Sequence, residues 1–287
     1  MFLNRKKRDY EERFFKAIMQ GFSFLVVTIM TWIIISVFIK GFPAINLEMI
    51  TSKPSGGFYF GGGGGILNAI IGSLYLAIGS TFIALFISLP VSMYLNVNMI
   101  KHIRLKNFIR LFIDVLWGVP SVVYGAFAFS VMIYLGMRSS LLAGIITVSI
   151  FIVPIMIRSM DEVLKQVPRE LYESALSLGS TNHEIAYKVF FRQCLPGLVT
   201  AVLLSFGRAI GDAAAPLFTT GFTDNLPSSL TQPAATLPLA IFFQLSSPNA
   251  DVQTRAYASA VVLTVIILII SISGRLIFYW FSKNRIK

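Results

Sequence analysis

The chain has 287 residues, of which 55% are hydrophobic and 13% are charged, and its formal net charge is +11. Soluble domains carry about 25% charged residues, so this composition excludes an ordinary soluble globular domain. The positive charge does not indicate nucleic-acid binding, because no RNA- or DNA-reading motif is present. The single cysteine, Cys194, excludes a disulfide framework within the chain and a cysteine-based metal site.

Long apolar blocks predict an all-α, polytopic bundle of six transmembrane helices. A helix needs about 20 consecutive apolar residues to cross a hydrocarbon core of roughly 30 Å. No small-residue cleavage site follows the first block, so we expect a retained helix and not a signal peptide. In chain order, the expected spans are residues 21–39, 67–95, 109–135, 141–158, 195–218 and 256–281.

Basic residues alternate between the connections, and this pattern predicts the orientation of the chain. Of the 24 basic residues, 18 lie at the two termini or in the second and fourth connections and their edges, and four lie on the opposite side. Cytoplasmic loops carry the excess of Lys and Arg in membrane proteins. We therefore expect a multi-pass protein of the cytoplasmic (inner) membrane with both termini in the cytoplasm.

The expected organisation has four parts. Residues 1–19 form a basic cytoplasmic segment, and residues 20–64 hold the first span and an external glycine-rich loop. Residues 65–282 form the core of the bundle, and residues 283–287 form a cytoplasmic tail. The glycine run at 61–65 is not a nucleotide-binding loop, because the Lys and Ser or Thr of a P-loop do not follow it.

The cytoplasmic segment 161–192 is too polar to span a membrane and too long for a tight turn. Pro168 can open a short helix there, and Gly179 can end it at a left-handed cap. A second short helix is expected near Asn182. The first helix has one apolar face, which consists of Leu171, Ala175 and Leu178. The spacing leaves open whether this helix packs on its own bundle or projects into the groove of a partner.

Two charged residues lie inside the expected fifth span, Arg208 near mid-depth and Asp212 one turn further at i+4. A charge at the centre of a membrane helix costs roughly 2.5–3.5 kcal/mol, and such residues face a bundle interior or a wet cavity. The planar guanidinium of Arg208 suits an oxyanion. Asp212 could accept the proton of a hydrogen phosphate or hold Arg208 in place. Two interpretations stay open, a structural Arg–Asp pair and a role along the substrate path.

Other polar residues have simpler interpretations. Asp114 follows Arg110 at i+4 near the end of the third span, and we expect these two to form a structural pair. His102 and His183 show no ligand-like spacing, so neither a metal site nor a cofactor is expected.

Several motifs resemble known transporter families. Glu173, Ser174, Ala175 and Gly179 are similar to the EAA–Gly loop of ABC importer permeases, with Ser174 in place of the usual Ala. In that family the loop forms a coupling helix that docks on an ATPase subunit. Five further stretches, in shared order, resemble PstA-type permeases of phosphate importers: residues 65–74, 114–121, 208–212, 216–219 and 236–238.

This resemblance implies an ABC importer permease fold that forms one half of a paired membrane channel. It also implies two cytoplasmic ATPase subunits, a second related permease and an external phosphate-binding protein as partners. The sequence has no ATP-binding motif, so the chain is expected to be a transport subunit and not an enzyme. The predicted function is translocation of inorganic phosphate by alternating access, driven by a separate ATPase chain.

Three alternatives remain at this stage. The same architecture could carry molybdate, sulfate or a phosphonate, because Arg208 would suit any of these anions. An ion-driven secondary transporter would offer no reason for the loop that contains Glu173 and Gly179. A non-transporting membrane scaffold would leave Arg208 and Asp212 unexplained.

The predicted orientation can be tested by labelling with an impermeant thiol reagent on intact cells. Gly56→Cys and Leu230→Cys should react, because both positions are expected outside the cell. Ser180→Cys should not react, because it lies in the expected cytoplasmic segment. Labelling of Ser180→Cys from outside would contradict the predicted topology.

Overall fold

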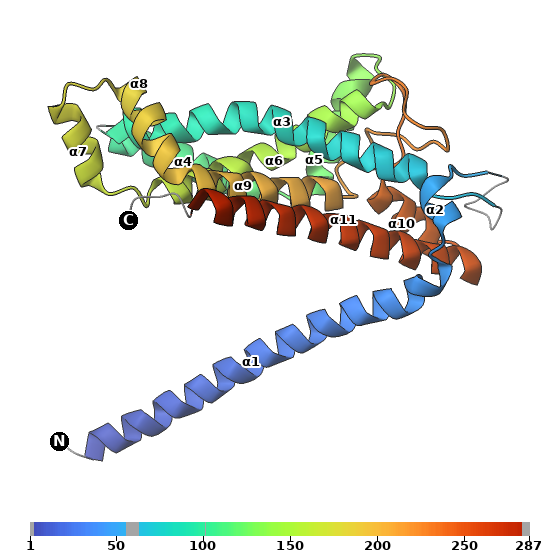
Figure 1. The fold of residues 1–287 in the computed structure, drawn as a ribbon, viewed down its shortest axis with the longest axis horizontal. Coiled ribbons are helices and arrows are strands. Elements are labelled where there is room, and N and C mark those ends of the chain that lie inside the picture. Colours follow the sequence, from blue (N-terminus) through green and yellow to red (C-terminus); the bar gives the residue numbers. More distant parts are fainter. Residues whose placement is uncertain (1–2, 56–62, 101, 283–287) are drawn as a thin grey trace.

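The computed structural model describes residues 3–55, 63–100 and 102–282 (Figure 1). Within these residues the fold is helical and contains no β-strand, as the sequence predicts. The expected tail at 283–287 and the first two glycines of the run at 61–65 lie outside the described residues. The helices are α1 (Leu3–Gly41), α2 (Leu47–Thr51), α3 (Leu67–Val97), α4 (Ile103–Gly118), α5 (Ser121–Tyr134), α6 (Leu141–Leu164), α7 (Arg169–Ser177), α8 (Asn182–Glu184), α9 (Arg192–Gly211), α10 (Leu237–Leu245) and α11 (Ala250–Ser282).

The structure contains the predicted membrane spans, and one of them is bent. In the described part of the chain, five helices are long and apolar enough to cross a membrane, and α4 and α5 together make a sixth crossing if the bent pair counts as one span. A π-helical segment, Ile185–Phe191 (η4), joins α8 to α9. The six-span helical bundle that the sequence predicts is therefore confirmed as a fold class.

The centre of the bundle is the pair α3 and α6, which lie side by side (Figure 1). The hydroxyl of Ser149 donates to the carbonyl of Ser80, and the hydroxyl of Ser88 donates to the carbonyl of Val153, both at 3.3 Å. Contacts advance in the same direction along both helices, so the two helices run parallel. Small residues allow this close approach, as is typical of helix packing in membranes.

Helix α1 leaves the bundle as an arm (Figure 1). None of its most apolar window is buried within the chain. It contacts α11 near its own C-terminal end, where the Lys40 Nζ lies 4.9 Å from the centroid of the Tyr257 ring. The sequence predicts a span here, and the structure extends that helix well beyond the apolar block in the N-terminal direction.

The third span, expected at 109–135, is divided into two helices. The helix stops at Gly118, and α4 and α5 meet at 91°. Proline lacks a backbone N–H and disfavours helical geometry in the residue before it. Accordingly Val119 is extended, with φ −72° and ψ 128°, and Pro120 precedes the first residue of α5. The apolar run continues through the corner, so hydropathy alone does not show the size of the bend.

The prediction of a fifth span at 195–218 is wrong at both ends. The helical segment begins earlier, at Asn182, and α9 ends at Gly211. Asp212 is extended, with φ −81° and ψ 126°, and turns occupy 214–220. Asp212 therefore lies outside α9 and does not share a helical face with Arg208. Its carboxylate caps the turn that follows the helix.

Candidate functional site

The two helix breaks meet inside the bundle at Asp212. One carboxylate oxygen of Asp212, Oδ1, accepts a hydrogen bond of 2.8 Å from the hydroxyl of Ser121, the first residue of α5. The other oxygen, Oδ2, accepts a hydrogen bond of 2.9 Å from the backbone N–H of Ala215. The Tyr124 hydroxyl donates to the Leu116 carbonyl at 2.9 Å and closes the α4–α5 corner. Backbone that is not helical at membrane depth needs such partners, and it is found where it lines a cavity or is buried in protein.

A seam continues from this joint along α5. A Cβ added to Gly125 would lie 2.7 Å from the carbonyl oxygen of Ala215, so only glycine allows the two backbones to approach this closely. One turn further, the rings of Phe129 and Phe218 have centroids 6.1 Å apart. Ser121, Gly125 and Phe129 lie at i, i+4 and i+8, so one face of α5 packs along the segment that follows α9.

Arg208 lies in the last turn of α9 and is exposed within the chain. Its guanidinium carbon, Cζ, lies 5.2 Å from the centroid of the Phe151 ring. Phe151 is ten residues from the start of the 24-residue helix α6, so the guanidinium lies near the middle of the bundle. Within the described residues, no hydrogen bond or ion pair engages the guanidinium, and none joins it to Asp212. Its N–H donors remain available.

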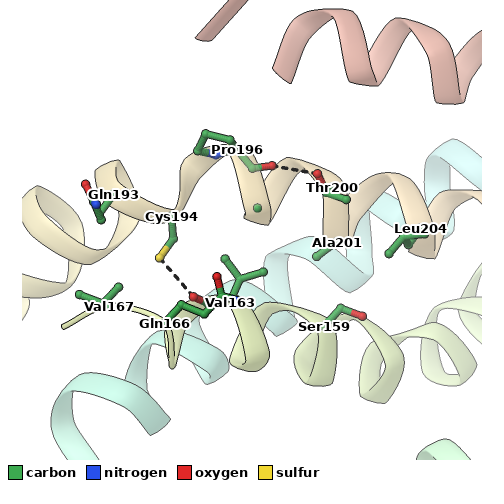
Figure 2. Close-up of a pocket in the computed structure, with 11 residues that line it drawn as sticks. Ser159, Val163, Gln166, Val167, Gln193, Cys194, Pro196, Thr200, Ala201 and Leu204 are labelled. Atoms are coloured by element: carbon green, nitrogen blue, oxygen red, sulfur yellow. Dashed lines mark hydrogen bonds between the residues drawn. The ribbon is translucent and has the colours of Figure 1, made fainter. Parts of the chain in front are cut away.

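An open cleft lies between α6 and α9, with a volume of about 480 Å³. Figure 2 shows Ser159 and Val163 on α6, and Cys194 of α9 directed at Val163, whereas the Thr200 hydroxyl donates to the Pro196 carbonyl of its own helix. The Cys194 thiol donates to the Val163 carbonyl at 3.6 Å, and this contact joins the two walls. Polar groups contribute to the lining, from Ser159, Gln166, Gln193 and Thr200.

The α9 wall of this cleft leads towards Arg208. Thr200 and Leu204 line the cleft, and Arg208 follows them at the same four-residue spacing. All three are exposed within the chain, and the Leu204 side chain is 63% exposed. One uncovered face of α9 therefore carries the cleft residues at one end and a free guanidinium at the other.

Residues 161–192 contain the two short helices that the sequence predicts after Pro168 and near Asn182. Pro168 precedes the first residue of α7, and Gly179 follows the helix with φ +80°. Helix α8 begins at Asn182, where the Thr181 hydroxyl caps the helix. Figure 1 shows α7 at one extremity of the bundle.

The predicted apolar face of α7 is not buried as a unit. Ala175 is 8% exposed, whereas Leu171 is 40% and Leu178 is 86% exposed. Glu173 and Ser174 are exposed as well. Of the two interpretations left open by the spacing, the structure favours a projecting helix, since Ala175 is the one residue of this predicted face that is buried. This segment lies at the opposite end of α9 from Arg208 and Asp212, so the structure does not bring the two predicted sites together (Figure 1).

A buried ionic cluster lies at the end of α6 that leads to α7. The Asp161 side chain is 2% exposed, and its Oδ1 accepts 2.8 Å hydrogen bonds from Arg110 of α4 and Asn96 of α3. Lys165 lies 2.9 Å from its other oxygen. The sequence reasoning missed Asp161 as the centre of this cluster, although Lys165 at i+4 was a signal for it.

The expected pair of Arg110 with Asp114 is wrong. Arg110 turns to Asp161, and Asp114 is 3.2 Å from Arg158 of α6. Both contacts cross from α4 to α6, because the buried carboxylate of Asp161 needs a cation and the two helices lie against each other. No group of three or more His, Cys, Asp or Glu in the described ranges could hold a metal ion.

The helical bundle, the projecting helix and the broken spans define the membrane subunit of a transporter. Residues 88–287 match the family model described as binding-protein-dependent transport system inner membrane component. The chain belongs to this family. It is therefore a transport component and not an enzyme.

Two relatives agree with this assignment, and a solved structure shares the fold. The chain is 33% identical to the phosphate transport system permease protein PstA of Pasteurella multocida, over 88% of this chain and 89% of that protein. It is 30% identical to PstA of Haemophilus influenzae, over 96% and 98%. The MetNI methionine ABC transporter in an inward-facing conformation is similar in fold, with a TM-score of 0.64 at 21% identity over 75% of this chain and 95% of that chain.

The Asp161 cluster generates a stability prediction. Asp161→Ala should lower the free energy of unfolding by about 3–5 kcal/mol, because Arg110 would remain partly buried without its partner. Glu162→Ala removes an exposed partner of Arg158 and Lys165 and should cost no more than about 1 kcal/mol. Thermal unfolding of the detergent-solubilised protein measures both, and equal transition temperatures for the two variants would contradict the cluster's role.

Proposed function

We propose that this chain is a permease subunit that carries inorganic phosphate across the inner membrane by alternating access, powered by ATP hydrolysis on a separate chain. The single observation that carries the proposal is the free, exposed guanidinium of Arg208 at mid-bundle, beside two helix breaks. A guanidinium can give two parallel hydrogen bonds to phosphate oxygens. The names of the PstA relatives support phosphate as the substrate.

The path runs along the uncovered face of α9. Arg208 meets the anion at mid-depth, and the cleft lined by Thr200 and Leu204 serves the cytoplasmic side. A second, related permease completes the channel by covering this face. Alternating access then requires the two bundles to open towards one side at a time.

The projecting helix α7 docks on the ATPase. Its exposed Leu171 and Leu178 supply an apolar knob for a groove in the partner. Two cytoplasmic ATPase subunits and an external phosphate-binding protein complete the assembly. Both termini lie in the cytoplasm, in agreement with the charge distribution.

The direct test is reconstitution of the co-purified complex in proteoliposomes with ATP inside and the binding protein outside. Phosphate should be taken up, and sulfate, molybdate and methylphosphonate should be taken up at least about tenfold more slowly, since a built oxyanion site discriminates by unpaired polar groups. If one of the other anions is taken up faster than phosphate, that anion and not phosphate is the substrate. Uptake without any ATPase subunit would favour a secondary transporter.

The role of Arg208 predicts a graded mutational series. Arg208→Gln should abolish phosphate uptake, and Arg208→Lys should impair it, because lysine keeps the charge but loses the planar fork. Arg275→Gln is the matched control, because Arg275 is an exposed arginine of α11 outside the cleft. Complex assembly is measured by co-purification in each case. Uptake restored by adding Asp212→Asn to Arg208→Gln would defeat the proposal, since no guanidinium would remain to meet the anion.

The coupling role of α7 predicts the effect of Gly179→Val. A β-branched residue at φ +80° strains the cap by about 1–2 kcal/mol and should separate ATP hydrolysis from transport, with normal amounts of protein in the membrane. Gly136→Val is the matched control, because Gly136 also has a positive φ, +65°, and an added Cβ meets nothing within 4 Å at either position. Normal uptake per ATP by Gly179→Val would count against docking through α7.

A further inference from the structure

The contact between Arg208 and Phe151 belongs to a longer chain of contacts. Phe151 is 2% exposed, in the middle of α6. Its ring also packs on the ring of Tyr124, with centroids 5.7 Å apart and planes tilted by 59°. Tyr124 in turn is anchored by its hydroxyl to the carbonyl of Leu116, across the α4–α5 corner. The guanidinium therefore rests on an aromatic pair that is fixed to the broken span.

Helical spacing suggests Asp212 as the partner of Arg208, but Asp212 bonds to other groups. Both oxygens of Asp212 accept hydrogen bonds, from the Ser121 hydroxyl and the Ala215 N–H. Among the described residues, no carboxylate pairs with this guanidinium, and the Phe151 ring is its aromatic contact. A cation within about 6 Å of an aromatic centroid is attracted by the negative face of the ring.

An aromatic partner and a carboxylate partner differ in their effect on the N–H donors and the charge of the guanidinium. A carboxylate would take up N–H donors and neutralise the charge, and both are needed for an anion. An aromatic face attracts the cation without neutralising its charge, and a stacked guanidinium keeps its in-plane donors. It also restricts a long side chain that would otherwise lose rotamer freedom on meeting the anion.

We propose that Phe151 is a positioning residue for the transported anion, because its ring holds the Arg208 guanidinium at mid-bundle with the donors unoccupied. This inference rests on the proposed function of Arg208 in phosphate transport. The competing role for Phe151 is packing alone, since it belongs to the main hydrophobic core of the bundle. The two roles differ in one respect: packing depends on the shape of the ring, and positioning depends on its negative face.

Fluorination of the ring separates these roles. Fluorine atoms withdraw charge from the face of phenylalanine with little change in its shape. Phenylalanine with one, two or three ring fluorines, introduced at position 151 by nonsense suppression, should lower the maximal rate of phosphate uptake stepwise, by up to about tenfold. The reconstituted complex with saturating binding protein is used throughout. A rate that is unchanged across the series would overturn the proposal.

Phe243 of α10 provides the control. Its ring packs edge to face on the ring of Phe222, with centroids 5.0 Å apart, and no cation–ring contact is found for it in the described part of the chain. The same analogues at position 243 should leave the uptake rate unchanged. An equal fall at positions 151 and 243 would show a general packing effect and would also overturn the proposal.

A spectroscopic readout tests the contact without transport. The ¹⁹F resonance of 4-fluorophenylalanine at position 151 should shift in Arg208→Gln and should not shift in Arg275→Gln. An unmoved resonance in Arg208→Gln would overturn the proposal. Failure of the proposed function is recognised separately, because the unmodified complex would then take up no phosphate or Arg208→Gln would transport normally.

Discussion

The carboxylate of Asp212 joins two interrupted helices inside the bundle, and the geometry around it depends on that joint. Hydrocarbon offers no hydrogen-bond partner to free backbone groups, so breaks at membrane depth require partners from the protein. Asp212 accepts from the Ser121 hydroxyl at the start of α5 and from the Ala215 N–H after α9. Ser121 and Asp212 are 91 positions apart in the chain, yet their contact lets α5 and the segment after α9 pack as one unit.

This joint also explains how a charge can stay unpaired in the bundle. Because Asp212 serves the joint, Arg208 keeps its charge and its donors, and the Phe151 ring stabilises the cation. Arg208 also lies in the last turn of α9, where a cation interacts favourably with the partial negative charge of the helix end. A positive charge held in this way is suited to an anion that binds and leaves during each transport cycle.

Helix α6 connects this region with the end of the bundle that carries α7. It carries Phe151 near its middle and Asp161 near its end, where Asp161 ties α6 to α3 and α4. Helix α7 follows directly after the short link that contains Pro168. In the proposed function, a displacement of α7 that moves α6 also moves the Phe151 ring and the wall of the cleft, which gives a continuous physical route from α7 to the guanidinium.

Hydropathy, local caps and charge type were sufficient to predict the helical class, the span set, the ends of α7 at Pro168 and Gly179, and Arg208 as a charge in the membrane. These features depend on short stretches of chain, because lipid requires apolar helices and a positive φ requires glycine. Apolar residues follow both Pro120 and Asp212, so only the tertiary structure decided that α4 meets α5 at 91° and that α9 ends at Gly211. The partners of Arg110, Asp212 and Arg208 were likewise decided by tertiary packing. Each of these residues has a partner on another helix, and long-range packing and the need to satisfy buried polar groups override the i+4 neighbour that the sequence offers.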